Sequence, residues 1–402
     1  MLRPDGTILA TPGFDRVTGC LYLPSADFPP VSERPTQAEA RAALDELADV
    51  WADFAWPDAG ALYVPVALTM TILARPAIAG PTPGFAFDAS AAGSGKGKAA
   101  QCAVIIAPGR EAANLTWPVR EEETEKTLGA LALRGATVAL FDNVEGSFGG
   151  ASLDRALTTG DRIALRILGR SEAPELPWNA VVIATGNGIE LGSDTSRRVL
   201  VARQEPRTDR PEERTGPAPG RTWMHDPLLP WVRENRPRLV WAALTILRGW
   251  FVAGQPSMDC GTWGSFEEWA RIIPPALRWA GGENVLSCRA RERGGDEEAR
   301  MLEGFLDGWA RLFPKGGTAR SAIDCLYPRE RLRGEDLPPD GFDAVRDAVE
   351  AWTRCRAGEK PSPRRLGIQM RRRRGRVAGG RELQPVEIGG DSNTWISREV
   401  AL

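Results

Sequence analysis

Short apolar segments alternate with helical ones through the centre of the chain, and this alternation constrains the fold more than any other feature. The apolar segments are Phe85–Phe87, Thr137–Phe141, Ala180–Thr185 and Val199–Val201. Each is nearly free of polar residues, as is typical of strands covered on both faces of a parallel sheet. Helical stretches near 96–107, 122–133 and 150–159 separate them. This βαβ rhythm predicts an α/β fold with helices on both sides of a parallel sheet.

A Gly- and Ser-rich segment, SAAGSGKGK, follows the first predicted strand and precedes a helical stretch. The phosphate-loop pattern G-x-x-x-x-G-K-[ST] occupies this context, because small residues let backbone N–H groups turn towards phosphate oxygens. The helix N-terminus adds a positive dipole end, and Lys96 adds a charge near the β- and γ-phosphates of ATP. The predicted nucleotide-binding residues are Ser90, Ala91, Ala92, Gly93, Ser94, Gly95, Lys96, Gly97 and Lys98.

Two positions of this segment depart from the phosphate-loop pattern. Ser90 replaces its first glycine, and Gly97 replaces the Ser or Thr whose hydroxyl normally binds Mg²⁺. A Gly/Ser-rich loop with two solvated lysines is therefore the alternative interpretation of the motif taken alone.

The segment TVALFDN places Asp142 at the end of an apolar strand. A carboxylate at such a strand tip is able to hold Mg²⁺ directly or through water, so Asp142 is the predicted metal ligand. Asn143 stands where a glutamate that activates water usually follows, and Glu145 is the predicted base in its place. Further candidates for the base are Glu121, Glu122, Glu123 and Glu125. A solvated helix N-terminus is the simpler interpretation of that acidic run.

Two more polar features follow in the chain. Asn187 ends the apolar strand VVIATGN, where a polar side chain is able to orient the attacking water; an ordinary Asn-Gly turn is the alternative. Arg197 and Arg198 precede the next strand and are candidates for an arginine finger, which stabilises charge on a phosphoryl group of a neighbouring subunit. A surface salt-bridge pair is the alternative for these arginines.

Much of the chain resembles the ATPase/helicase part of phage- and plasmid-type primase–helicase proteins, which are P-loop ATPases of the AAA+/superfamily 3 kind. The matching segments are FDASAAGSGKGK, REEETEKTLGALALRG, FDNVEG, DRIALRILGRSE, VVIATGNGIELGSDTSRRVLV, RPEER, RLVWAALTILRGW and GSFEEWARII. The resemblance is most specific from about Phe85 to Ile273. It implies ATP and Mg²⁺ as cofactors, DNA as partner, and a homo-oligomeric ring such as a hexamer.

The same resemblance bears on Gly97, on Asn143 and on the priming of DNA synthesis. Proteins of this family tolerate Gly after the phosphate-loop Lys and Asn after the metal-binding Asp. Relatives often carry an N-terminal primase–polymerase domain. The sequence shows none, so any priming activity is expected to come from a separate primase.

The last 42 residues are strongly basic, with nine arginines and four acidic residues between Pro361 and Leu402. The predicted DNA-binding residues are Arg371, Arg372, Arg373, Arg374, Arg376 and Arg381. The glycine pairs Gly379–Gly380 and Gly389–Gly390 predict turns between short elements, and the segment is similar to part of a small winged-helix module. Its arginines are expected to contact phosphates with little sequence readout. A solvated basic tail is the alternative.

Composition excludes several other classes of protein. Six cysteines without a Cys-x-x-Cys pair argue against zinc sites and a disulfide framework, and a single histidine, His225, argues against histidine-based catalysis. The longest apolar stretch, roughly Gly60 to Ala74, contains Pro65 and is too short to span a bilayer, so it predicts a buried helix. We therefore expect a cytoplasmic protein without a membrane partner.

The chain is expected to divide into four regions. These are a turn-rich and helical N-terminal region (1–80), a P-loop AAA+-like ATPase core (81–205), a helical region (206–360) and a small basic winged-helix-like module (361–402). Two functions fit this organisation: a ring-forming DNA helicase or replication ATPase, and a nucleotide-gated DNA-binding loader or regulator with little hydrolysis. A small-molecule kinase uses a similar loop but does not account for the arginine pair or the basic end.

Overall fold

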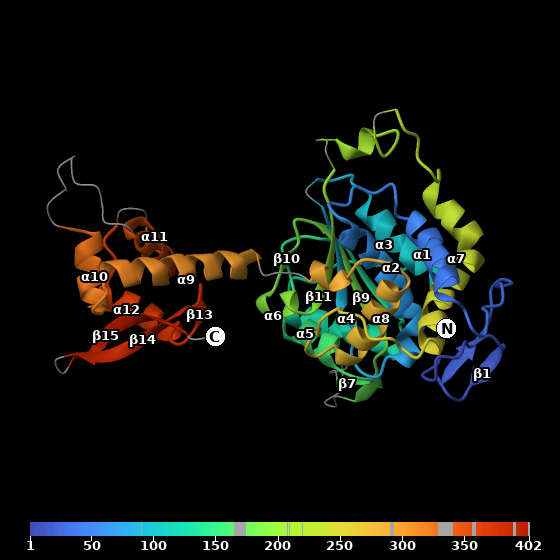
Figure 1. The fold of residues 1–402 in the computed structure, drawn as a ribbon, viewed down its shortest axis with the longest axis horizontal. Coiled ribbons are helices and arrows are strands. Elements are labelled where there is room, and N and C mark those ends of the chain that lie inside the picture. Colours follow the sequence, from blue (N-terminus) through green and yellow to red (C-terminus); the bar gives the residue numbers. More distant parts are fainter. Residues whose placement is uncertain are drawn as a thin grey trace. The chain divides into compact units, whose positions relative to one another are not determined.

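The computed structural model describes residues 1–89, 91–164, 174–206, 208, 210–218, 220–289, 293–328, 341–355, 359–388 and 391–400. The chain forms two compact units, Met1–Arg291 and Glu292–Leu402 (Figure 1). The predicted helical region 206–360 is thus divided between them: its first helices belong to unit 1 and its later ones to unit 2.

Unit 1 is built on a five-stranded sheet in the order β11-β3-β9-β5-β4, and every neighbouring pair is parallel. The strands are β3 (Gly84–Ala89), β4 (Asn114–Leu115), β5 (Val138–Val144), β9 (Val181–Asn187) and β11 (Val199–Gln204). When the five strands are numbered in chain order, their order across the sheet is 5-1-4-3-2. The parallel sheet predicted from the sequence is confirmed, and the short edge strand β4 is an addition to it.

Helices cover both faces of this sheet (Figure 1). The core on one face includes residues of α1 (Gln37–Asp49), α2 (Ala59–Ala74), α3 (Lys96–Ile106), α7 (Leu228–Val252) and α8 (Glu267–Trp279). The other packs against α4 (Glu121–Leu133) and α5 (Ala151–Thr158). The strands alternate between the two cores as a two-residue repeat requires: Phe85 and Phe87 join the first, and Ala86 joins the second.

Local sequence explains where the first helices begin and what they bury. Thr36 caps α1 by accepting from the backbone N–H of Glu39, and the Glu39 side chain accepts from the backbone N–H of Thr36, which completes a capping box. Among the described residues one helical span, Ala59–Ala77, is long and apolar enough to cross a membrane, and 72% of its most apolar window is buried. Burial in the first core accounts for that apolar character, as predicted from the sequence.

Smaller elements complete unit 1. They are β1 (Gly13–Asp15), β2 (Cys20–Tyr22), β6 (Ser147–Phe148), β7 (Arg162–Ala164), β8 (Glu175–Pro177), β10 (Glu190–Leu191), α6 (Ser193–Ser196), η1 (Arg75–Ala77), η2 (Pro211–Glu213) and η3 (Val285–Cys288). Of these, α6 leads into β11, and η2 lies in the segment that joins β11 to α7.

Unit 2 combines helices with an antiparallel sheet in the order β12-β15-β14-β13. Its elements are α9 (Arg293–Leu312), β12 (Gly317–Thr318), α10 (Ala319–Leu326), α11 (Phe342–Thr353), α12 (Pro363–Arg372), β13 (Val377–Ala378), β14 (Arg381–Ile388) and β15 (Asp391–Glu399). Trp309 of α9 lies in its core and donates to the carbonyl of Trp395, 3.1 Å away. The arrangement is winged-helix-like, with α11 as an additional helix.

The turn between β13 and β14 is the one predicted from the first glycine pair. Gly379 and Gly380 link Ala378 to its partner Arg381, and both have positive φ angles, 56° and 72°. A two-residue hairpin with this backbone favours glycine at both positions. Gly389 and Gly390, the second pair, lie outside the described residues.

Candidate functional site

The predicted phosphate loop joins the carboxyl end of β3 to the first residue of α3. Gly95 caps the helix with a φ angle of 92°, and Lys96 and Gly97 form its first turn. Ser90 lies outside the described residues. Ala91 and Ala92 lie at the start of the loop, and Lys98 lies in the first turn of α3. The backbone N–H groups of this helix N-terminus have no partners within the helix, which is the usual basis of anion binding.

The loop has the features that a phosphate cradle requires. Gly93 and Gly95 both have positive φ, and a Cβ on Gly93 would lie 2.5 Å from a carboxylate oxygen of Glu212. Ser94 is buried, and its hydroxyl has no hydrogen-bond partner among the described residues. A buried hydroxyl without a partner is costly, so a ligand oxygen at this position would satisfy it. The residues present therefore fit the phosphates of a nucleotide.

Asp142 lies beside the start of α3, at the carboxyl end of β5. Its Oδ1 accepts a hydrogen bond from Thr185 Oγ1 at 2.5 Å, and its Oδ2 accepts one from Asn114 Nδ2 at 3.0 Å. The Thr185 hydroxyl also accepts from the backbone N–H of Asn143 at 3.0 Å. A Cβ on Gly97 would lie 3.7 Å from Asp142 Oδ1, so the carboxylate faces the position of the usual metal-binding hydroxyl.

Asn187 is the last residue of β9, the strand that lies between β3 and β5, and its side chain contacts Lys96 of the phosphate loop. Its Oδ1 accepts a hydrogen bond from Lys96 Nζ at 2.7 Å. Burial lowers the pKa of the Lys96 ammonium, whereas Asp142 and Asp88 raise it. The bond to Asn187 thus fixes the position of the Lys96 ammonium at the carboxyl edge of the sheet.

Three polar residues of this site were missed by sequence reasoning. Asp88, on β3, is buried and accepts from the backbone N–H of Ile189 at 3.0 Å. Thr185 and Asn114 hold the Asp142 carboxylate. A buried Asp and a Thr inside otherwise apolar strands were visible signals, but Asn114 lies on a two-residue strand that carries no periodicity.

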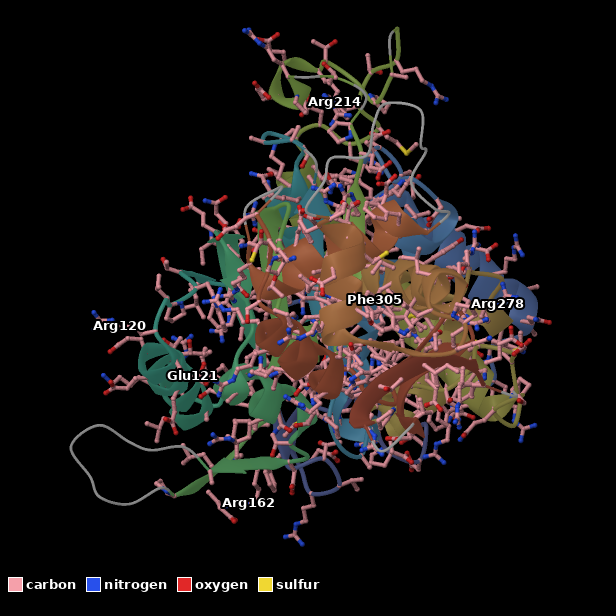
Figure 2. All side chains as sticks on the ribbon, turned by 90° about the vertical axis from the view of Figure 1, so that its left-hand side faces the viewer. Arg120, Glu121, Arg162, Arg214, Arg278 and Phe305 are labelled. Carbon is pink, nitrogen blue, oxygen red and sulfur yellow. The ribbon has the colours of Figure 1, made fainter. Side chains whose placement is uncertain are left out.

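The acidic candidates for a general base are mostly held by other contacts. The Glu121 carboxylate accepts from the backbone N–H of Ser152 at 2.5 Å, at the start of α5. Lys126 pairs with both Glu122 and Glu123, at 3.2 and 2.7 Å. Glu125 lies 3.9 Å from an Arg155 nitrogen. Figure 2 shows Glu121 beside Arg120 at the start of α4.

Glu145 is exposed, and its Oε1 lies 3.5 Å from the side-chain nitrogen of Asn143. Asn143 itself has a positive φ of 51°, an uncommon backbone conformation for a residue with a side chain. Of the predicted bases, Glu145 is therefore the one that remains close in the chain to Asp142 and open to solvent.

The arginine pair lies at the opposite end of the sheet from the phosphate loop. Val199, which follows Arg198, pairs with Gly84 at the start of β3, whereas the loop follows Ala89 at its end. Five residue steps along a strand correspond to about 17 Å. Arg197 and Arg198 are thus not brought to the phosphate loop of their own chain.

The two arginines differ in their surroundings. The Arg198 guanidinium is 20% exposed and lies 2.9 Å from Asp154 Oδ1. The Arg197 side chain is 71% exposed and pairs with Asp194. Both arginines therefore form salt bridges, and Arg197 is the more exposed of the two.

A cavity of about 490 Å³ adjoins the phosphate loop. Lys96 and Lys98 line it at the loop, and Asp49, Asp53 and Asp226 line it elsewhere. The remaining lining includes aromatic and charged side chains, namely Phe54, Glu212, Arg214, Trp223 and His225. Lysines together with acidic and aromatic side chains suit a ligand that carries both phosphates and a ring with N–H and O–H donors.

The segment between β11 and α7 supplies many of the acidic and aromatic side chains that line this cavity. His225 stacks on Trp231 with ring centroids 3.5 Å apart, and its Nε2 lies 2.8 Å from an Asp49 oxygen. The Arg214 guanidinium lies 5.4 Å from the centroid of Trp223. Figure 2 shows Arg214 on this segment.

The predicted DNA-binding arginines separate into two groups. On α12, Leu366 and Met370 are buried in the core of unit 2, which leaves Arg371 and Arg372 on the exposed side. Arg374 and Arg376 are exposed as well.

The other two arginines pack against unit 2. The Arg373 guanidinium lies 4.2 Å from the centroid of Trp352. Arg381 lies 2.8 Å from Glu399 and donates to the Ser397 hydroxyl at 3.1 Å. These contacts give Arg373 and Arg381 roles in holding the module together.

Comparison with known proteins gives a limited result. No family model matches the chain, and no curated protein matches it. A solved apo structure, the A form of the NrS-1 C-terminal region, is similar with a TM-score of 0.43 and 14% identity, covering 94% of this chain and 78% of that one. A second, of residues 305–718 of the same region, has a TM-score of 0.42 and 12% identity, covering 93% and 76%. Neither similarity assigns an activity to this chain.

Thr185→Val is expected to lower the free energy of unfolding by about 1–3 kcal/mol, because Asp142 and the Asn143 N–H lose a buried partner. Thr245→Val is the matched control, since the Thr245 hydroxyl is buried without a partner among the described residues. That change should be neutral or stabilising. Urea unfolding followed by circular dichroism compares the two, and equal losses would contradict the prediction.

Proposed function

We propose that this protein binds ATP with Mg²⁺ at the phosphate loop and hydrolyses it on DNA, as a helicase or replication ATPase of a prophage or plasmid. One observation carries the proposal: three adjacent parallel strands bring Lys96, Asn187 and Asp142 to the same edge of the sheet. A glycine loop with an unsatisfied buried hydroxyl lies at that edge. Phosphoryl transfer depends mainly on such positioning and charge stabilisation.

Each residue of the site has a role in this proposal. The loop N–H groups, the Ser94 hydroxyl and the Lys96 ammonium would hold the phosphates. Asp142 would hold Mg²⁺ directly or through water, and bound Mg²⁺ would neutralise charge on the phosphate oxygens. Asn187, which bonds Lys96 at 2.7 Å, would orient the attacking water next to them. The acidic and aromatic side chains that line the 490 Å³ cavity would contact the base and the ribose.

The arginine pair supports assembly rather than action within one chain. A strand length of about 17 Å separates it from its own phosphate loop. Arg197, the exposed member, would therefore act on the nucleotide of a neighbouring copy in a ring. Arg198 would position the segment through its bond to Asp154.

A nucleotide-gated DNA-binding loader or regulator is the second candidate. It is favoured by Gly97 and Asn143, which remove the usual magnesium-binding and water-activating side chains, and by the engagement of the acidic run elsewhere. This candidate predicts ATP-dependent assembly on DNA with turnover near background, whereas the motor predicts turnover that DNA stimulates.

Lys96→Ala and Asp142→Ala are expected to abolish DNA-stimulated ATP turnover, because the first removes the phosphate charge and the second removes the metal ligand. Turnover is measured by phosphate release with and without single-stranded and forked DNA. Lys126→Ala, which removes a lysine paired with Glu122 and Glu123 on α4, serves as control. Unchanged turnover in both site variants would contradict the proposal.

Gly97→Ser should strengthen Mg²⁺-dependent nucleotide binding, because it places a hydroxyl next to Asp142, where a Cβ lies 3.7 Å from the carboxylate in ordinary contact. Gly97→Ala is the control, since it adds the same Cβ without the oxygen. Titration of Mg²⁺ against a fluorescent ATP analogue distinguishes them. An identical Mg²⁺ dependence for the two variants would contradict the placement of the metal between position 97 and Asp142.

The exposed arginines of unit 2 are proposed to contact DNA phosphates. The triple variant Arg371→Ala, Arg372→Ala, Arg374→Ala should bind DNA more weakly and reduce the slope of log K against log salt by roughly 2 to 3. Anisotropy titrations over a range of NaCl concentrations measure this slope. Arg271→Ala, an exposed arginine on α8, is the control. An unchanged slope would favour the solvated-tail interpretation.

A further inference from the structure

The segment RPEER, Arg210–Arg214, has no role in the phosphate-binding mechanism proposed above. It contains the 3-10 turn η2 and lies between β11 and α7. Pro211 is buried, and Pro211, Glu212 and Arg214 line the 490 Å³ cavity together with the phosphate loop. The fold therefore brings this segment to the proposed nucleotide site.

Glu212 packs directly on the phosphate loop. A Cβ on Gly93 would lie 2.5 Å from a carboxylate oxygen of Glu212, 2.9 Å from its Cβ and 3.2 Å from its backbone nitrogen. Both the side chain and the backbone of the turn thus occupy the space beside Gly93, whose φ of 73° also favours glycine. The contact places a negative charge against the loop that is predicted to receive phosphates.

The Glu212 carboxylate has no ion-pair or hydrogen-bond partner among the described residues. Its neighbours in the segment are engaged with one another. Glu213 pairs with Arg210 at 2.9 Å, and Arg214 donates from Nε to the Pro211 carbonyl at 3.1 Å. A carboxylate whose charge is not balanced in this way repels an anion that approaches the same loop.

The segment that contains η2 is attached at both ends to the loop after α1. The backbone N–H of Glu205 donates to the Ala55 carbonyl at 2.8 Å, and the backbone N–H of Met224 donates to Asp53 Oδ2 at 2.6 Å. Between these attachments, the hydrogen bonds that residues 210–214 form with other described residues all lie within the segment. The turn is therefore able to leave the phosphate loop while both attachments stay in place.

The phosphate loop attracts the carboxylate for the same reason that it would attract a phosphate. Lys96 and Lys98 line the same cavity, and the N-terminus of α3 adds the positive end of its dipole. A carboxylate beside such a loop is stabilised in the absence of nucleotide, whereas ATP brings several negative charges to the same place. Electrostatic repulsion then makes the two occupants exclude one another.

We propose that Glu212 is an autoinhibitory residue of the nucleotide site: its carboxylate competes with the phosphates of ATP for the loop, and binding of ATP displaces the η2 turn. The inference rests on the proposed ATP binding and extends it to the control of that binding. The turn would thus hold one position in the nucleotide-free chain and another in the loaded one, with the attachments at Glu205 and Met224 unchanged.

Glu212→Gln tests the proposal, because it keeps the shape of the side chain and removes its charge. It should bind a fluorescent ATP analogue roughly threefold to tenfold more tightly than the wild type, since each exposed charge pair contributes modestly and the triphosphate carries several charges. Glu213→Gln is the matched control, because Glu213 lies on the same turn, is 63% exposed and does not line the cavity. This control should bind the analogue as the wild type does.

Competition with the parts of the nucleotide shows where Glu212 acts. Inorganic tripolyphosphate should displace the analogue more effectively from Glu212→Gln than from the wild type, relative to the affinity of each for the analogue with its phosphates removed. Adenosine should bind both proteins equally, because only the phosphates meet the carboxylate. A gain that appears for adenosine and not for tripolyphosphate would overturn the proposal.

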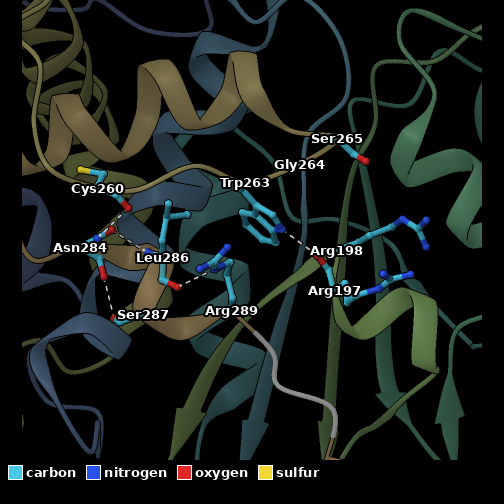
Figure 3. Close-up of a pocket in the computed structure, with 10 residues that line it drawn as sticks. All are labelled: Arg197, Arg198, Cys260, Trp263, Gly264, Ser265, Asn284, Leu286, Ser287 and Arg289. Carbon is cyan, nitrogen blue, oxygen red and sulfur yellow. Dashed lines mark hydrogen bonds between the residues drawn. The ribbon is translucent and has the colours of Figure 1, made fainter. Parts of the chain in front are cut away.

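A second cavity, of about 730 Å³, presents arginines to the tripolyphosphate probe at the other end of the strands. Arg197, Arg198 and Arg289 line it, and Figure 3 shows the side chains of the first two pointing away from the third. The cavity therefore does not gather these cations at one point. Lys96→Ala, which retains all three arginines, should lose tripolyphosphate binding and thereby assign that binding to the phosphate loop.

Hydrogen exchange measures the displacement of the turn without reference to turnover. A non-hydrolysable ATP analogue should slow amide exchange in the phosphate loop and speed it in a peptide that contains Glu212. The reason is that the backbone nitrogen of Glu212 packs beside Gly93 in the nucleotide-free chain.

Several other outcomes would overturn the inference. They are equal affinities of Glu212→Gln and Glu213→Gln for the analogue, tripolyphosphate binding that Lys96→Ala retains, and unchanged or slower exchange at the turn when the analogue binds. Weaker analogue binding by Glu212→Gln would instead make Glu212 a ligand of the nucleotide or its metal and also overturn it. If neither the wild type nor Glu212→Gln binds the analogue, the proposed function falls, and this inference falls with it.

Discussion

The side-by-side pairing of β3, β9 and β5 is the constraint on which the rest of the site depends. Parallel strands place their carboxyl ends at one edge, and hydrogen bonding fixes neighbours about 4.8 Å apart. Because β9 separates the other two, Asn187 lies between the phosphate loop and Asp142, and its oxygen meets Lys96 at 2.7 Å. The same pairing puts Thr185 opposite Asp142, where a 2.5 Å bond orients the carboxylate.

The length of the strands separates the predicted phosphate loop from the arginine pair. The carboxyl edge of the sheet carries the phosphate loop, and its amino edge carries Arg197 and Arg198. In the proposed mechanism, the phosphate loop and Arg197 of one chain lie too far apart to act on the same nucleotide. Under that proposal, association with a second copy would bring Arg197 to the phosphate loop of its neighbour.

Prediction from the sequence succeeded for strands, for helices and for residues that lie at the end of an apolar run. The strands, the helices between them and the positions of Asp142 and Asn187 at strand ends follow from apolar runs and the residues that end them. It failed where a contact joins distant segments. Asn114 was missed because β4 has only two residues and carries no periodicity. The contacts of Arg373 with Trp352 and of Arg381 with Glu399 also join segments far apart in the chain, and composition does not reveal them.

By itself, the sequence determined the α/β class, the glycine loop at the start of a helix and the polar residues that end buried strands. These are local properties, since backbone preference and hydrophobic periodicity act over a few neighbouring residues. Only the tertiary structure decided that Thr185 holds Asp142, that Arg198 is bound to Asp154, and that Glu212 packs on Gly93. Those pairings depend on strand order and on packing between segments far apart in the chain, and periodicity within a segment carries no information about either.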